Sequence, residues 1–308
     1  MSINNLFPVS GYELSELSTD HKINRILVAA LGEREITHSS QSSSHPIYWD
    51  TNYFDLDRMS IFRDASELEQ QQILHQLNQQ LLEESLYIEQ AGVGYMAKMV
   101  LMANSTQERM LYSLFAADET SHLAQLQSYV SVDTTGTPDD PFLQLLAEIV
   151  ESEDRSVLLF VLQVVLEGWG LTHYRHLAKG CTDQTLQLLF QSFLHAESRH
   201  HGAGITLFNQ AELSTNSQTT IVDCLATFLQ MVRVGPQRVV HAIATHKGHL
   251  SRPQRIKILQ ELDTVCHSHQ RLQLLRSIMV NTSSNIVNAL EEKDLFTPLS
   301  PEEAASYG

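Results

Sequence analysis

Two short stretches of the sequence pair a glutamate with a histidine three residues later, a spacing typical of metal ligands. They are Glu119–His122 and Glu197–His200. On a helix, residues i and i+3 lie on the same face, so a carboxylate and an imidazole can bind one ion together. A third such pair, Glu35–His38, lies in a serine-rich stretch, and chance alone supplies about one in a chain with 15 histidines. We therefore give the third pair no role.

The first two pairs belong to an internal repeat in which equivalent positions lie 78 residues apart. The offset that relates Glu119 to Glu197 also carries Glu89 onto Glu167. Each half therefore predicts one helix with a lone glutamate, a turn, and a second helix with Glu-x-x-His. The 30 residues from glutamate to glutamate suit two antiparallel helices that meet at mid-length. The same offset relates three further pairs: His122 and His200, Phe115 and Phe193, and Gly92 and Gly170.

Charge balance explains why these side chains would gather around two metal ions. The four carboxylates bring four negative charges, the neutral imidazoles bring none, and two divalent cations bring four positive charges. Such a buried site is near neutral, whereas four unpaired buried carboxylates would be strongly destabilising. Carboxylate and imidazole ligands without a thiolate suit iron or manganese.

This ligand set resembles that of the ferritin-like di-iron carboxylate superfamily over residues 66–211, about half of the chain. The resemblance implies a four-helix bundle that holds two iron ions, with manganese or a mixed pair as the alternative. It implies that Glu119 and Glu197 bridge the ions. It also gives each ion one further carboxylate and one imidazole: Glu89 with His122, and Glu167 with His200.

The resemblance also suggests an orienting partner for one of the histidines. Family members commonly carry an aspartate directly before one glutamate of the Glu-x-x-His pairs, bonded to the far ring nitrogen of a ligand histidine. Asp118 fits this role, directed toward His200. The equivalent position in the other half is Ala196, so the orienting partner of His122 stays open.

Several positions have alternatives. Glu84 could replace Glu89, although the apolar stripe and the repeat favour Glu89, and His201 could replace His200. The whole set could also be a coincidence of exposed salt-bridging side chains, but the apolar surroundings of Glu167 argue against that. Five more histidines are interpreted as surface residues or as neighbours of the ligands: His173, His176, His195, His246 and His249.

Four residues beside the ligands form a predicted pocket. Phe115 and Phe193, each four residues before a Glu-x-x-His glutamate, are either plain core or the walls of a substrate cavity. Gly92 and Gly170, each three residues after a lone glutamate, either allow close helix packing or leave room beside the metals for dioxygen or substrate.

The elements that must position these residues are helices, and we expect an all-α chain. Apolar residues at three- and four-residue steps predict a helix over 66–102, and Ser105–Glu108 is a capping box that opens a helix to about Tyr129. A loop follows over 133–141. Its last two residues suit the N-cap and first position of a helical stretch over 142–179, broken near 152–156.

The rest of the chain is also predicted to be helical. Thr182 is the expected N-cap of a helix to about Asn209, and two or three helices should fill 221–290. The tail, with Pro298 and Pro301, is expected to be loose. We predict an irregular N-terminal segment over 1–60, a di-metal four-helix bundle over 61–212, and a C-terminal helical extension over 213–308 that packs on the bundle.

Composition narrows the class of partner. The chain has 308 residues and a formal net charge of −16, which repels phosphate backbones and anionic membranes, so we expect neither nucleic acid nor membrane as a partner. The three cysteines are widely spaced and predict reduced thiols. No secretory pattern is visible near the N-terminus, and we expect a cytoplasmic protein.

The expected function is that of an O2-activating non-haem di-iron oxidase or oxygenase acting on a small, largely apolar organic substrate by hydroxylation, N-oxygenation or desaturation. No flavin or nicotinamide motif is present, so electrons would come from an external ferredoxin or reductase. A ferroxidase or peroxide-scavenging protein without organic substrate is one alternative, and a helical binding module with vestigial ligands is another. A homodimer is compatible with the sequence.

Overall fold

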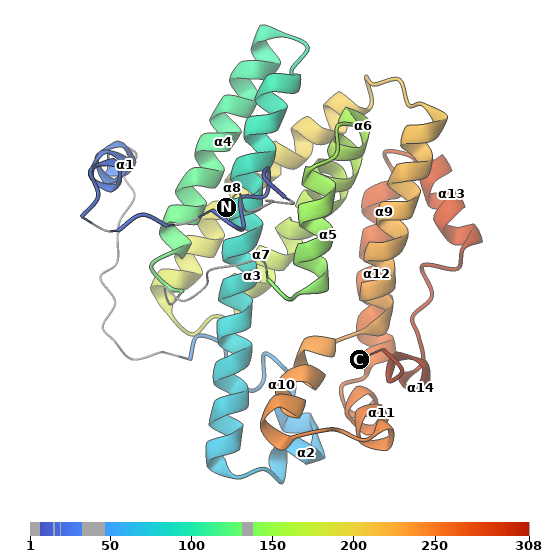
Figure 1. Ribbon diagram of the computed structural model, residues 1–308. Coiled ribbons are helices and arrows are strands. Elements are labelled where there is room, and N and C mark those ends of the chain that lie inside the picture. The colour runs from blue at the N-terminus through green and yellow to red at the C-terminus, as the bar shows by residue number, and fades with distance from the viewer. Residues whose placement is uncertain (1–6, 15, 19, 33–46, 131–137, 308) are drawn as a thin grey trace, which may run out of the picture. The chain divides into compact units, whose positions relative to one another are not determined.

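The computed structural model describes the chain except for residues 1–6, 15, 19, 33–46, 131–137 and 308 (Figure 1). Every regular element in the described part is a helix, and no strand occurs there. The predicted all-α class is therefore confirmed, while a bundle of the ferritin-like type stays a prediction. The Glu35–His38 pair and the serine-rich stretch around it lie outside the described residues, as does most of the predicted 133–141 loop.

The chain forms two compact units, and the long helix α3 (Glu67–Met102) contributes to both. Unit 1 consists of residues 1–44 and 81–153, and unit 2 of residues 45–80 and 154–308. The predicted division of the chain into segments 1–60, 61–212 and 213–308 stays a prediction.

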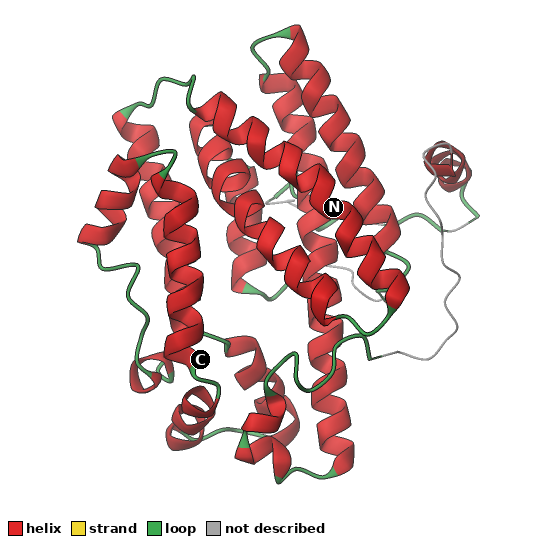
Figure 2. Cartoon of the chain, turned by 180° about the vertical axis from the view of Figure 1, so that it is seen from behind, coloured by secondary structure: helices red, strands yellow, loops and turns green. Residues whose placement is uncertain are grey.

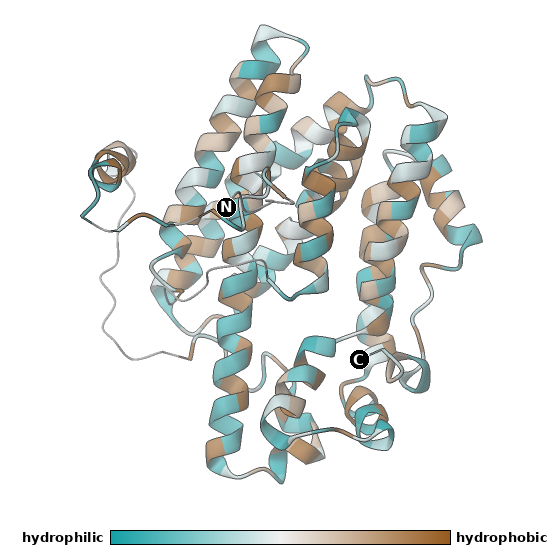
Figure 3. Ribbon diagram, viewed as in Figure 1, coloured by the Kyte–Doolittle hydropathy of each residue, from teal (hydrophilic) through white to brown (hydrophobic). Residues whose placement is uncertain are grey.

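Unit 1 contains the helices that carry the first half of the repeat. These are the second part of α3 and α4 (Thr106–Leu126), and the unit also contains α1 (Lys22–Gly32) and α5 (Pro141–Val150). The Ser105 hydroxyl accepts the Glu108 N–H at 3.1 Å and so caps α4, which is the first half of the predicted capping box, while the Glu108 carboxylate accepts the Asn104 N–H at 2.9 Å. Asp140 caps α5 with Pro141 at its first position, also as predicted. Hydrophobic residues dominate α5 (Figure 3), and most of them are buried.

Described residues near the start of the chain lie against α3 in unit 1, and the predicted irregular segment over 1–60 stays a prediction. The amide of Gln90 donates to the carbonyl of Gly11 at 2.6 Å, and the N–H of Val9 donates to the carboxylate of Glu151 at 2.6 Å. Gly94 has no side chain where the Val9 carbonyl passes, and a Cβ there would collide with that oxygen. The residues around Val9 and Gly11 thus contact α3 at Gln90, the residue that follows Glu89.

Unit 2 contains the second half of the repeat and all later helices. The two helices that bear ligands, α7 (Glu167–Gly180) and α8 (Gln184–Phe208), run side by side (Figures 1 and 2). The remaining elements are η1 (Leu56–Arg58), α2 (Ser60–Arg63), α6 (Arg155–Val157), the π-helix η2 (Leu158–Leu166), α9 (Thr215–Val234), α10 (Gln237–Lys247), α11 (Arg252–Glu261), α12 (Thr264–Val280), α13 (Ser284–Glu292) and α14 (Pro301–Ala304).

The segment before α7 is a π-helix, which the sequence did not predict. Residues 158–165 are all buried, including Gln163, and η2 continues directly into α7. By length and composition alone, the helical run Arg155–Gly180 is apolar enough to cross a membrane, and 56% of its most apolar window is buried inside the protein. A single run of this kind is weak evidence for a membrane span, because the mostly buried core helix of a soluble protein passes the same test.

Three other details differ from the predictions. Asp183, not Thr182, caps α8, because the Thr182 hydroxyl and N–H are bonded to the carbonyl of Tyr48 instead. The stretch 221–290 lies in five helices rather than two or three. The tail is not loose: Ser300 and Glu303 form a capping box for α14, whose Ala304 is fully buried in the core beside α10 and α11.

Candidate metal centre

The first triad consists of Glu89, Glu119 and His122, all in unit 1. Glu89 comes from α3, and the Glu-x-x-His pair presents Glu119 and His122 on one face of α4. Nδ1 of His122 lies 3.0 Å from Oε2 of Glu89 and 3.9 Å from Oε2 of Glu119. All three residues are buried. A cation could therefore find two carboxylates and one imidazole within reach of one another.

Gly92 makes room for one carboxylate of the first triad. A Cβ at position 92 would lie 2.7 Å from Oε2 of Glu119 and 3.0 Å from its Cδ. Real Cβ atoms essentially never lie closer than 3.0 Å to such an atom, so the carboxylate would have to shift. The carboxylate of Glu119 fills the space that a side chain at position 92 would need, and the choice between the two interpretations of Gly92 stays open.

The second triad consists of Glu167, Glu197 and His200, all in unit 2. Glu167 is the first residue of α7, and the other two share one face of α8. Nδ1 of His200 lies 3.6 Å from Oε2 of Glu197 and 3.9 Å from Oε2 of Glu167. His200 is fully buried, whereas the side chain of Glu167 keeps 16% of its exposure. The second triad repeats the donor set of the first.

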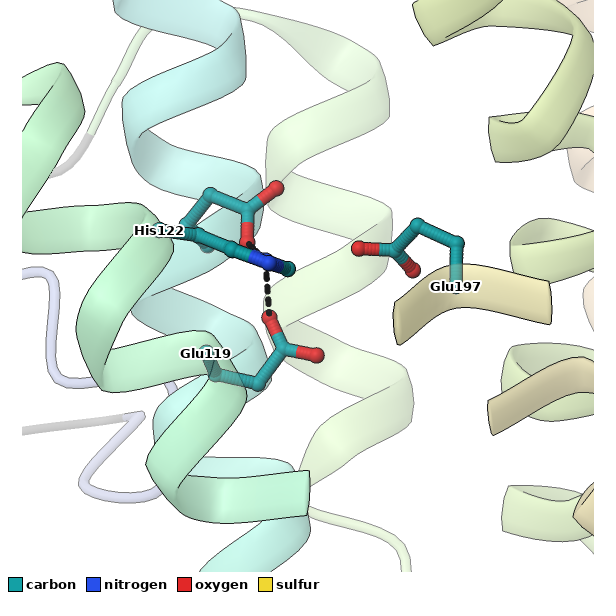
Figure 4. Close-up of side chains that lie close together, drawn as sticks. Glu119, His122 and Glu197 are labelled. Carbon is teal, nitrogen blue, oxygen red and sulfur yellow. Dashed lines mark hydrogen bonds and ion pairs between the residues drawn. The ribbon is translucent and has the colours of Figure 1, made fainter. Parts of the chain in front are cut away.

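Four-residue groups that could hold a metal ion include all six predicted ligands. In each group, one ligand atom per residue lies within 4.8 Å of the others. Figure 4 marks the contact between His122 and Glu119 in unit 1 with a dashed line. Glu119 and Glu197 occur in both groups. The groups are Glu89, Glu119, His122 and Glu197, and Glu119, Glu167, Glu197 and His200.

The chemistry of this donor set fits divalent transition-metal ions. Carboxylates held this close repel one another, and burial removes the water that would otherwise screen them. Cations between them would offset that repulsion, and oxygen with imidazole nitrogen is a ligand set that iron and manganese accept. The described structure therefore contains a largely buried carboxylate–histidine cluster that could hold a metal ion.

The structure separates the alternative ligands from the preferred ones. Glu84 lies half-buried on α3 and belongs to neither group, whereas Glu89 does. His201 is not grouped with the carboxylates, because its Nδ1 lies 3.0 Å from the carbonyl oxygen of Gln163. Among the described residues, no other histidine joins either group. Asp118 is half-buried on α4, and its role as partner of a ligand histidine stays a prediction.

The predicted pocket residues have different surroundings in the two halves. Phe115 is buried edge-to-face against Tyr112, and Phe193 is buried against Tyr174 and Phe190, so both contribute to core packing. Their role as cavity walls stays a prediction. Gly170 differs from its equivalent Gly92, since a Cβ there would meet no described atom within 4 Å. The sequence repeat is therefore not matched by equal packing at this position.

Sequence reasoning missed the residues that hold η2 against α8. The signal was a single amide, Gln163, inside the apolar run Val157–Leu166. A buried amide needs hydrogen-bond partners, and here the side chain of Gln163 donates to the carbonyl of His200 at 3.1 Å. Spacing motifs could not show this contact, because it joins positions 37 residues apart.

Comparisons of the chain with protein-family models, with curated proteins and with solved structures find no match. The family is therefore not shown by similarity. Support for a function comes instead from the two triads and the helices that carry them.

Proposed function

We propose that this chain is a di-metal oxidase or oxygenase that activates dioxygen with two iron ions, manganese or a mixed pair being the alternative. The observation that carries the proposal is the presence of two Glu–Glu–His sets, buried except for the half-buried Glu167, whose ligand atoms form two groups with two carboxylates in common. A structural ion site needs only one such set. Two sets that share carboxylates are suited to a pair of ions held close together.

Each ligand has a definite part in this proposal. Glu119 and Glu197 would be shared by the ions, while Glu89 with His122 and Glu167 with His200 would complete one ion's ligand set each. When bound, the ions would supply the redox chemistry with dioxygen. The buried rings of Phe115 and Phe193, one turn before the bridging carboxylates, keep water away from that side of each helix.

The reaction class requires a reductant as well as a substrate. Hydroxylation of a C–H bond by dioxygen inserts one oxygen atom and releases the other as water, which consumes two electrons and two protons. The chain has no flavin or nicotinamide motif, so we propose a ferredoxin or reductase as electron donor. A small, largely apolar molecule is the proposed substrate, and the cytoplasm is the proposed location, with a homodimer compatible with both.

Metal analysis is the first test of this proposal. Protein expressed with added iron should contain about two iron or manganese ions per chain, and Glu84→Ala should keep them because Glu84 lies outside both groups. Protein that binds no transition metal would remove the proposal altogether. That result would favour the vestigial binding module instead.

The reaction with dioxygen separates the enzyme classes. Anaerobically reduced protein is mixed with dioxygen in a stopped-flow spectrometer. An oxygenase should show a transient absorbance that decays slowly without substrate. Repeated turnover of excess Fe²⁺, or rapid consumption of added peroxide, would instead identify a ferroxidase or a peroxide scavenger and contradict the oxygenase assignment.

A further inference from the structure

The backbone N–H of Glu167 does not follow α-helical hydrogen bonding, and a histidine side chain bonds to the carbonyl four residues before it. In an α-helix, the N–H of residue 167 would donate to the carbonyl of residue 163. Here the N–H of Glu167 donates to the carbonyl of Leu162, five residues back. The carbonyl of Gln163 accepts from the ring of His201 instead, with 3.0 Å between Nδ1 and the oxygen.

A second hydrogen bond runs in the opposite direction between the same two helices. The side-chain amide of Gln163 donates to the backbone carbonyl of His200 at 3.1 Å. Gln163 has no exposed surface, so water does not compete for either of its two bonds. The bonds involve residues directly beside ligands, since His201 follows His200 and Gln163 precedes Glu167 by four positions.

Two glycines allow these helices to approach closely enough for both bonds. A Cβ at Gly204 would collide with the Cβ of Gln163. A Cβ at Gly168 would lie 2.8 Å from Cε1 of His201 and 3.1 Å from its Nδ1. The π-helix, the histidine ring and the two glycines therefore form one closely packed contact within unit 2.

The hydrogen-bond register of η2 determines which way Glu167 points. Each residue turns an α-helix by about 100°, so a change of register by one residue rotates every later side chain by about that angle. Such a rotation would move the Glu167 carboxylate away from His200, whose Nδ1 now lies 3.9 Å from it. π-helical turns inside α-helices occur frequently at functional sites, which agrees with this placement.

We propose that His201 and Gln163 are positioning residues that hold η2 in its π register and thereby aim Glu167 at the second metal ion. The inference rests on the proposed function, because it assumes that the second triad binds metal. His201 acts through the Gln163 carbonyl and is not a ligand. A carbonyl only accepts hydrogen bonds, so Nδ1 of His201 carries the hydrogen.

The test compares two substitutions of His201 by titrating metal-free protein with Co²⁺ and following its visible absorption. His201→Leu removes the donor, and His201→Asn keeps an N–H group near the place of Nδ1. We expect His201→Leu to lower the affinity for one of the two ions about tenfold or more, as the loss of a contact that supports a ligand does in other metal sites. The other ion should bind as in wild type, and His201→Asn should restore most of the lost affinity.

His195 provides the matched control, because it is an exposed histidine on the same helix. His195→Leu should leave both ions unchanged. Wild-type affinity of both sites in His201→Leu would overturn the inference and leave the proposed function standing. A wild-type protein that binds no Co²⁺ would overturn the proposed function and this inference with it. Equal weakening of both sites in His201→Leu would also count against a role confined to Glu167.

A measurement on the wild-type protein covers the case in which the variants do not fold. In metal-free protein labelled with ¹⁵N-histidine, His201, assigned by comparison with His201→Asn or by triple-resonance spectra, should carry its hydrogen on Nδ1. The amide of Glu167 should exchange slowly with solvent. A hydrogen on Nε2 alone would exclude the bond to Gln163 and overturn the inference.

Discussion

Nδ1 of His201 lies 3.0 Å from the carbonyl oxygen of Gln163, where the backbone N–H of Glu167 would donate in an α-helix. This relationship gives the π-helix a physical cause. The ring of His201 donates to this buried carbonyl and so adds a hydrogen bond between α8 and the irregular segment, a contact worth about 0.5–1.5 kcal/mol. The buried amide of Gln163 is likewise bonded, to the carbonyl of His200. The polar groups inside this apolar segment therefore stabilise one arrangement of the ligand-bearing helices.

Removal of a ligand should abolish metal binding without unfolding the protein. In Glu167→Ala and His200→Ala, we expect loss of bound metal, with the free energy of unfolding of the metal-free protein changed by about 1 kcal/mol or less. The reason is that metal-free carboxylates repel one another, so the fold does not depend on them. Metal at one hundred times its Kd should stabilise the wild-type protein by about 2.7 kcal/mol but not the variants.

Element analysis and urea unfolding with and without Mn²⁺ would check this prediction. Glu84→Ala is the control, since Glu84 is a half-buried glutamate on α3 outside both groups. Wild-type metal content in both ligand variants would contradict the ligand assignment. Loss of the fold in both would instead show that these side chains stabilise the helices directly.

The two equivalent glycines should respond differently to alanine. Gly92→Ala places a methyl group 2.7 Å from Oε2 of Glu119, so the carboxylate must move and we expect metal affinity to fall about tenfold. Gly170→Ala meets no described atom within 4 Å and should leave affinity unchanged while stabilising the helix by about 0.5–1 kcal/mol. Metal titration and thermal unfolding of both variants measure this contrast. Equal metal affinities in the two variants would argue against a bridging position for Glu119.

Alanine at Gly204 should destabilise the contact between η2 and α8. The added Cβ collides with that of Gln163, and overpacking of this kind costs about 1–3 kcal/mol. Gly202→Ala is the control on the same helix, because Gly202 is exposed and a Cβ there meets no described atom within 4 Å. Urea unfolding of both variants gives the comparison. A stability of Gly204→Ala equal to that of Gly202→Ala would show that the helices can separate freely.

Much of the helical framework could be predicted because its signals are local. Ser105 with Glu108, and Asp140 with Pro141, begin helices through bonds that span only a few residues. The ligand pairs were recognisable for the same reason, since residues i and i+3 share a helix face wherever the helix packs. The repeat then connected Glu89 and Glu167 to those pairs without any knowledge of tertiary contacts.

The features that escaped prediction depend on contacts distant in sequence. Thr182 has the residue type of an N-cap, but its hydroxyl bonds to Tyr48, and Asp183 caps α8 instead. The π register of η2 depends on a ring 38 residues later, that of His201. Ala304 belongs to an ordered tail because it packs into the core beside α10 and α11. Propensity and spacing carry no information about such partners.

Glu69, in the first turn of α3, should contribute to the stability of the fold in a pH-dependent way. Hydrogen bonds from the N–H and hydroxyl of Ser66, together with Lys247 at 3.1 Å, lower the pKa of Glu69 from 4.5 to about 2. Because the folded pKa is below the unfolded one, the stabilisation is complete above pH 4.5 and is lost as the pH falls toward 2. Urea unfolding should therefore show Glu69→Gln less stable than wild type at pH 6, with the difference shrinking below pH 4.5. Glu67→Gln, an exposed change in the same turn, should show no such convergence. A difference between wild type and Glu69→Gln that stays constant from pH 6 to pH 3 would contradict the role of this carboxylate.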